Sequence, residues 1–342
     1  MATFSKKIVR LKFTGPLHIG TGRSDNYEHS DELIRSDTIK SALYVVYRQV
    51  YPELAQQNDG LDFFTSFTIS SAFPFYEDEL FLPKPVSGFA MEFPDLSENE
   101  KSKLSKRSKK IQFVGLKVFG KFISGTPVIL NEKHLDSSKR FLFSQPQSEE
   151  SKLKILTREM QQRVYIPHSG EQNQNSQPYF IERLFFAKDA GLYFLMEVKD
   201  DELLNRLTVC IKILGDMGFG TDKNVGNGQF EATVEDFKME VPENATHQLA
   251  LGLFCPEKEA INFANLTAST FATIKRGGFL VSAQDENFRH FRKKSVYMFT
   301  EGSTFPAAMP NQGKVVNLKP ETVETMHPVW RDGTCLFLPI KL

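Results

Sequence analysis

The chain has 342 residues, 40% of them hydrophobic, which is enough for about two domains with hydrophobic cores. Its 42 lysines and arginines equal its 42 aspartates and glutamates, so no overall positive field attracts nucleic acid, and any such site must be local. The cysteines Cys210, Cys255 and Cys335 are far apart and form no CxxC pair, which argues against a structural zinc site or a disulfide framework and favours a reducing, cytoplasmic setting.

The termini and loops give no sign of a membrane, a metal or a cofactor. The N-terminus lacks an apolar signal segment, and the chain has no apolar run long enough to span a bilayer. Acidic residues and histidines do not cluster with the spacing of metal ligands. We therefore expect no cofactor, no metal and no membrane partner.

The first elements predicted are a strand, a polar loop and an amphipathic helix. Residues 8–19 alternate as a strand does, and Ser36 or Asp37 is a natural N-cap for a helix. Residues at helical spacing then form an apolar face that should pack on a sheet: Ile39, Ala42, Leu43, Val46 and Val50. A strand-rich stretch follows at 73–89.

A lysine-rich run lies at residues 101–110. Ser97 and Glu100 have the spacing of a capping box, which predicts a helix that begins just before the run. Such a run is usually a solvated helix face or a linker, and less often a phosphate-binding surface. We favour the solvated face and keep phosphate contact as the alternative.

Strand signals return at 112–123 and then in two runs, at 163–167 and 178–186, that flank a wholly polar segment. The pair predicts a long hairpin, or arm, with Tyr165, Ile166 and Tyr179 near its tip. A two-stranded projection is marginally stable alone in water. The arm is therefore either an exposed flexible loop or an element that meets a partner or a bound chain.

A buried strand at 191–198 and a helix at 202–214 lead into a glycine-rich loop. Residues 215–230 read GDMGFGTDKNVGNGQF, in which five glycines interleave with Lys223, Asn224 and Asn227. Glycine permits positive φ and close approach, so such a loop can present backbone amides to phosphates. It matches neither GxGxxG nor GxxxxGK[ST], and a plain multi-turn connection is the alternative. A strand at 229–237 follows it.

The order of elements to this point is β, α, β, β, α, β, which is that of ferredoxin-like and RRM-like domains. After residue 242 the pattern restarts, with strands at 247–255, 273–283 and 295–300, a short helix at 260–266, and a last strand in TCLFLPI. The sequence thus predicts an α+β fold of two ferredoxin-like (RRM-like) domains with long insertions, residues 1–242 and residues 243–342.

Several strings resemble a known family. LHIG at 17–20, SDTIKSAL at 36–43, FLPKP at 81–85 and the glycine loop are similar to the RAMP superfamily of CRISPR proteins. In the C-terminal half, KRGGF at 275–279, RKKSVYMFTEGS at 292–303, HPVWRDG at 327–333 and the terminal FLPI resemble the family of fourth subunits of type III-A Csm complexes, which caps the 5′ end of the guide RNA.

This resemblance implies a non-catalytic protein that binds the repeat-derived 5′ tag of the CRISPR RNA (crRNA). It further implies docking to the large polymerase–cyclase subunit and to the first backbone RAMP subunit, with target RNA in the assembled complex. Proteins commonly bind single-stranded RNA by stacking its splayed bases on aromatic side chains and by following its backbone with a basic groove. The candidate RNA-binding residues are His18, Gly20, Ser36, Arg163, Tyr165, Gly218, Gly220, Lys223, Asn224, Gly226 and Asn227.

In this interpretation the loop amides and Lys223 hold phosphates, His18 contacts bases, and the arm wedges between guide nucleotides. We expect Gly220→Val and Gly226→Val to remove RNA binding with little effect on stability. Two alternatives stay open. One is a RAMP-type endoribonuclease that processes precursor crRNA, with His18 or His29 as general acid or base. The other is an assembly scaffold whose glycine loop grips a protein segment.

Overall fold

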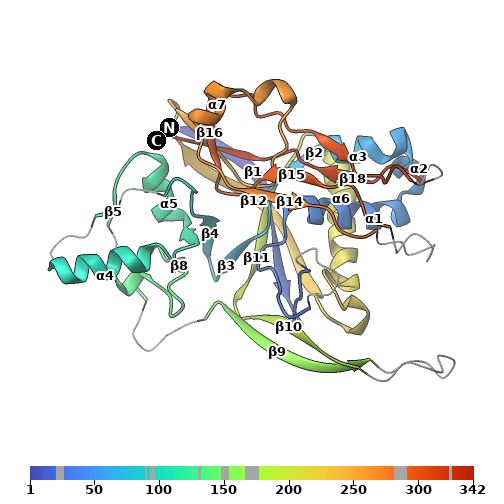
Figure 1. Ribbon diagram of the computed structural model, residues 1–342, viewed down its shortest axis with the longest axis horizontal. Coiled ribbons are helices and arrows are strands. Elements are labelled where there is room, and N and C mark those ends of the chain that lie inside the picture. Colours follow the sequence, from blue (N-terminus) through green and yellow to red (C-terminus); the bar gives the residue numbers. More distant parts are fainter. Residues whose placement is uncertain are drawn as a thin grey trace.

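A large, mostly antiparallel sheet forms the centre of the molecule in the computed structural model (Figure 1). Its strand order is β12-β1-β11-β3-β4-β6-β8, with β2 also beside β11. The structure describes residues 1–20, 27–88, 91–92, 97–129, 132–147, 154–165, 177–280, 291–322 and 326–342. The strands of this sheet are β1 (Ala2–Phe13), β2 (Phe67–Ile69), β3 (Phe73–Tyr76), β4 (Glu79–Pro83), β6 (Phe113–Gly115), β8 (Phe141–Leu142), β11 (Ala190–Val198) and β12 (Phe230–Val241).

Both faces of this sheet are buried at its centre. Successive side chains of a strand point to opposite faces. On β11, Leu192 and Phe194 join the cluster beneath the helices α1 (Ser36–Val50) and α6 (Asp201–Met217), whereas Tyr193 and Leu195 join the cluster on the other face. The continuous apolar run of β11 therefore reflects burial on two sides.

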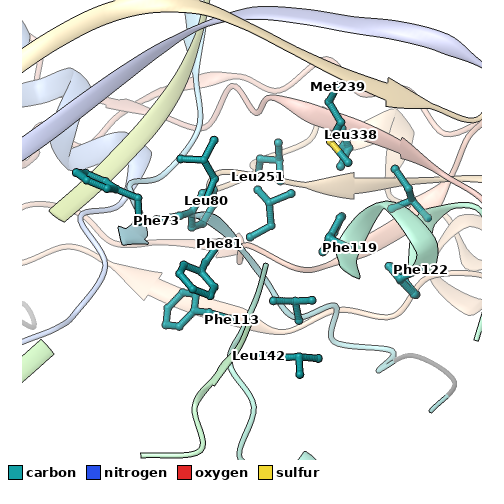
Figure 2. Packing of buried hydrophobic residues seen from close by; sticks show 14 of the residues in the cluster. Phe73, Leu80, Phe81, Phe113, Phe119, Phe122, Leu142, Met239, Leu251 and Leu338 are labelled. Carbon is teal, nitrogen blue, oxygen red and sulfur yellow. The ribbon is translucent and has the colours of Figure 1, made fainter. Parts of the chain in front are cut away.

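The second face is covered partly by the C-terminal part of the chain. Figure 2 shows Leu251 and Leu338 packed among Phe81, Phe119 and Met239, which come from β4, α5 (Leu116–Ile123) and β12. Residues on the two sides of residue 242 thus share one hydrophobic cluster. The two parts of the chain are held together by this shared core.

The C-terminal strands form small sheets. The three-stranded sheet has the order β16-β13-β19, and β14 pairs with β15 and β17 with β18, all antiparallel. These elements are β13 (His247–Ala250), α7 (Phe263–Thr267), β14 (Thr273–Arg276), β15 (Val296–Phe299), β16 (Thr304–Pro306), β17 (Val315–Asn317), β18 (Trp330–Asp332) and β19 (Phe337–Ile340).

The remaining elements lie at the edges of the molecule. The arm consists of β9 (Leu156–Tyr165) and β10 (Gln177–Phe186), which pair antiparallel over their full length and project from the body (Figure 1). The others are α2 (Pro52–Ala55), α3 (Leu61–Thr65), β5 (Met91–Glu92), α4 (Glu98–Ser108) and β7 (Val128–Ile129), with short 3₁₀ turns at Gln57–Gly60, Glu132–His134, Lys223–Val225 and Lys258–Ala260. Within the described ranges, no helix has the length and apolar character to cross a membrane.

Several elements follow the sequence closely. The helix at 36–50, the capping box of Ser97 and Glu100, the arm, and the strand–helix pair β11 and α6 are confirmed. The lysine-rich run lies on α4 and just beyond it, and its lysines are exposed or only partly buried, as expected for a solvated helix. The sheet, with helices on both of its faces, makes the fold a mixed α/β one.

Other expectations were wrong. The first strand runs from Ala2 to Phe13 and does not reach residue 19. Arg35, not Ser36 or Asp37, is the N-cap of α1, and its side chain makes no capping bond. The side chains of the two expected caps bond elsewhere, Ser36 to Leu253 and Asp37 to Arg276. Residues 116–123 form the helix α5 where strand was expected, since residues 119, 122 and 123 recur at helical spacing and are buried.

Candidate nucleic-acid interface

The glycine loop folds back against the segment that follows β1. The amide of Thr221 donates to the carbonyl of His18 at 3.0 Å, and the amide of Gly228 donates to the carbonyl of Pro16 at 2.8 Å. Across the loop, the amide of Phe219 donates to Gly228 at 2.9 Å. Two amides of the loop therefore bond to residues 16–18, and these bonds fix the shape of the loop without any ligand.

Two glycines of the loop serve different purposes. Gly220 has φ +89°, and a Cβ there would lie 2.3 Å from the carbonyl oxygen of His18. Gly226 has φ +83°, but a Cβ there would meet no atom within 4 Å. Gly220 is thus required by packing within the chain, which corrects the expectation that Gly220→Val would leave stability unchanged.

The centre of the loop presents unused amides. The backbone N–H groups of Asp222, Lys223 and Asn224 have no acceptor among the described residues. The side chains of Lys223 and Asn224 are exposed at the same place. Successive free amides next to a lysine form an arrangement that suits an anion.

The arm reaches this part of the loop. Arg163 of β9 donates through Nη1 to Oδ2 of Asp222 at 2.7 Å, and both side chains are about three-quarters buried. Arg183 of β10 is partly buried, and its Nε has no acceptor among the described residues. Burial first, and then the charge of Arg163, lower the pKa of Arg183. Sequence reasoning missed Arg183, which only the folded arm brings beside the loop, and it missed Asp222, whose partner Arg163 comes from the arm.

His18 lies beneath an aromatic pair. Its side chain is 1% exposed, with Nδ1 2.7 Å from the carbonyl oxygen of Glu182, and its Nε2 has no partner within the described ranges. The ring of Tyr27 lies 6.2 Å from the ring of His18 and 5.8 Å from that of Tyr179. Tyr27 is 39% exposed, so this pair offers an aromatic surface of the kind on which bases stack.

We call Arg163, Tyr179, Arg183, the loop residues 222–224, His18 and Tyr27 the arm–loop site. Asn227 borders it, is 2% exposed, and its Nδ2 lacks an acceptor among the described residues. Gly20 also borders it, since a Cβ at that position would lie 3.7 Å from Oγ1 of Thr221. Gly218 shapes the loop, with φ +80° and a position for Cβ 2.4 Å from the carbonyl of Asn227.

Two expected site residues stand apart. Ser36 is fully buried, and its Oγ accepts from the amide of Leu253 at 3.0 Å, so it joins the two parts of the chain. Tyr165 ends β9 at the edge of the described arm, and the polar tip at 166–176 lies outside the described residues. His29 is exposed. No group of three or more potential metal ligands occurs in the described part of the chain.

Comparison with known proteins covers nearly the whole chain. Residues 10–231 match the family model of the RAMP superfamily, and residues 243–340 match that of the CRISPR Csm4 C-terminal domain. Among curated proteins, the CRISPR system Cms protein Csm4 of Streptococcus thermophilus is 25% identical over 336 residues, covering 95% of this chain and 96% of the relative. The protein of the same name from Methanocaldococcus jannaschii is 23% identical over 331 residues, covering 86% and 84%.

Solved structures with the same fold come from two kinds of complex. The Csm3–Csm4 subcomplex of the type III-A CRISPR-Cas interference complex contains a chain that matches with TM-score 0.62 and 19% identity, covering 98% of this chain and 100% of that one. A Csm1–Csm4 cassette in complex with cA4 contains a chain that matches with TM-score 0.60 and 19% identity, covering 99% and 98%.

Proposed function

We propose that this chain, which belongs to the RAMP superfamily, is the non-catalytic, RNA-binding fourth subunit of a type III-A CRISPR interference complex. In this role it holds the repeat-derived 5′ tag of the crRNA for antiviral defence. The arm–loop site carries the proposal. It combines backbone amides and an Arg183 Nε that have no acceptor among the described residues, the exposed Lys223, the guanidinium group of Arg163, which bonds Asp222 through Nη1, and an aromatic surface.

The chemistry of the site suits single-stranded RNA. Free amides, lysine and arginine bind phosphates, and aromatic rings accept unpaired bases by stacking. The buried Nε2 of His18 and Nδ2 of Asn227 have no partner among the described residues, and in our proposal a polar edge of a base entering the site satisfies them. The neutral charge of the whole chain is no obstacle, since the positive groups are gathered at one place.

The proposed architecture and partners follow from the same family. We interpret the arrangement β1, α1, β3, β11, α6, β12 as an RRM-like unit at residues 1–242, with residues 243–342 as a second unit, and the two family models support a division between residues 231 and 243. Structures of proteins with the same fold have been solved in complexes with Csm1 and with Csm3. We accordingly propose the large subunit and the first backbone subunit as partners.

Binding of labelled RNA tests the proposal. We expect the purified chain to bind an RNA that carries the 5′ tag more tightly than a scrambled RNA of the same composition, and to leave both intact. Arg163→Met should weaken binding, whereas Lys103→Met on the solvated α4 helix should not. Equal affinity for both RNAs would contradict tag recognition. Site-specific cleavage abolished by His18→Ala or His29→Ala would replace our proposal with the endoribonuclease.

Assembly is tested separately. We expect the large subunit and the first backbone subunit to co-purify with the chain after complete nuclease treatment, because their contacts are between proteins. Loss of both partners on nuclease treatment would show that RNA alone holds them together.

A further inference from the structure

A second group of positive side chains lies where the two parts of the chain meet. Asp37, in the first turn of α1, is fully buried. Arg276 of β14 donates to it through Nε at 2.8 Å and Nη2 at 3.1 Å, and Arg331 of β18 donates through Nη1 at 2.9 Å. The backbone amide of Lys293 donates to the carbonyl of Gly278, two residues after Arg276, at 2.9 Å, and the Lys293 ammonium interacts with the charges of Arg331, Asp37 and Arg276. We call these four charged residues the junction cluster.

The junction cluster holds one carboxylate against three cations. The neighbouring charges do not balance the difference. Lys40 forms an ion pair with Asp332 at 3.2 Å, and Arg35 forms ion pairs with Asp31 at 3.2 Å and with Glu301 at 2.6 Å. Counted together, these nine groups still carry one more positive than negative charge. Buried charges in proteins are as a rule paired. The chain, as far as it is described, leaves this place short of an anion.

The shortage is located at Lys293 and Arg331. Lys293 is only partly exposed, and its Nζ has no ion pair among the described residues. Burial, and then repulsion by Arg331 and Arg276, lower the pKa of Lys293 to about 8. The Nε of Arg331 is buried and likewise has no acceptor among the described residues. A lysine beside a partly unused guanidinium group is a combination that binds phosphate.

We propose that the junction cluster binds a phosphodiester group of the guide RNA, with Lys293 and Arg331 as its contacts. This inference rests on the proposed function and extends the RNA path beyond the arm–loop site. The segment 27–38 borders both places. At one end the amide of Ser30 donates to Glu182 on the arm at 2.7 Å, and at the other Arg35 pairs with Glu301 and Asp37 contacts the two arginines.

The variant Lys293→Met distinguishes a lysine that contacts phosphate from one that only supports the fold. Without RNA the variant should melt at a higher temperature than wild type at pH 7, because it no longer buries an unpaired charge. It should also bind tag RNA about tenfold more weakly, as for the loss of a charge-assisted hydrogen bond. Its slope of log affinity against log salt should fall by about 0.7, the value for one single-strand phosphate.

Lys294→Met is the matched control. Lys294 is exposed and pairs with Glu321 at 2.8 Å, so its loss removes the same charge one residue away. We expect this variant to bind tag RNA like wild type. If wild type binds tag RNA and Lys293→Met binds it equally well with the same salt slope, the inference is wrong although the proposed function stands. If wild type does not bind tag RNA, the proposed function and the RNA part of the inference both fail.

Two further experiments identify the anion. Inorganic phosphate should raise the melting temperature of wild type more than that of Lys293→Met, and an equal effect on both would refute an anion site at the junction cluster. Asp285→Asn/Glu286→Gln, at positions outside the described residues, tests whether the chain supplies its own anion. We expect this double variant to retain wild-type stability. If instead it and Lys293→Met both melt at lower temperature than wild type, the missing anion is a carboxylate of the chain and the inference is overturned.

Discussion

The arm–loop site and the junction cluster hold their positive charge in opposite ways. In the arm–loop site, Lys223 is exposed, and the pair of Arg163 and Asp222 retains about a quarter of its side-chain surface in contact with water. In the junction, Asp37 has no exposed surface, and neither do the adjacent Lys40 and Asp332. Charges near water interact weakly, whereas charges in the interior strongly affect stability. Under the proposed function, the first region can therefore exchange its partners for RNA at little cost, while the second fixes how the two parts of the chain meet.

The largest contrast is expected from removing one acid in each region. Asp332→Ala leaves Lys40 buried without its carboxylate, which should lower the free energy of unfolding by about 3–5 kcal/mol. Asp222→Ala removes the partner of the more accessible Arg163 and should cost about 0–1 kcal/mol. Urea unfolding monitored by circular dichroism measures both. Equal losses would break the comparison.

Two alanine variants sharpen the description of the loop itself. Gly220→Ala and Gly226→Ala both place a side chain at positive φ, a strain of about 1–3 kcal/mol. Only Gly220→Ala also drives a Cβ towards the carbonyl of His18. We therefore expect a clearly greater loss of melting temperature for Gly220→Ala. The same melting temperature for both variants would mean that the loop does not pack on residues 16–18 as described.

A pH profile distinguishes the junction further. The pKa of Lys293 is lowered to about 8, with Arg331, Arg276 and Asp37 facing it. The unfolded chain, with a lysine pKa of about 10.4, binds more protons between these values, so stability should rise from about pH 8 to about pH 10. Relative to Lys293→Met, wild type should gain about 1–3 kcal/mol over this interval. A constant difference between the two proteins would show that Lys293 is not constrained in this way.

The smallest effect on stability is expected at the exposed end of the loop. Lys223→Ala should change the free energy of unfolding by no more than about 0.5 kcal/mol, as for most surface positions. It should nevertheless weaken binding of tag RNA and lower the salt slope by about 0.7. Fluorescence anisotropy over a salt titration measures this. A wild-type slope would place Lys223 outside the RNA path.

Local patterns in the sequence predicted much of the fold but little of either charged region. Helical spacing and a capping box identified α1, α4 and α6, and the alternation flanking a polar segment identified the arm. Residues 116–123 were misassigned because a short apolar run fits a strand or a helix equally well. Local patterns also could not reveal that Gly220 is fixed by His18.

The contacts that sequence reasoning missed are long-range ones. Asp222 and Arg163 are far apart in the chain and meet only because the arm folds over the loop. In the same way, Arg276 and Arg331 reach Asp37 from strands that follow it by more than two hundred residues. No local spacing signals such pairs. Lys223, Asn224 and His18 could be proposed from the sequence because their residue types and the glycines around them carry the chemistry locally.

Hydrogen exchange with and without tag RNA tests the central claim most directly, since it locates the RNA without any substitution. We expect binding to slow exchange at the free amides of residues 222–224 and along β9 and β10, and to leave the lysine-rich helix α4 unchanged. Protection of α4 with no change at residues 222–224 would contradict the account and place the RNA on the lysine-rich run.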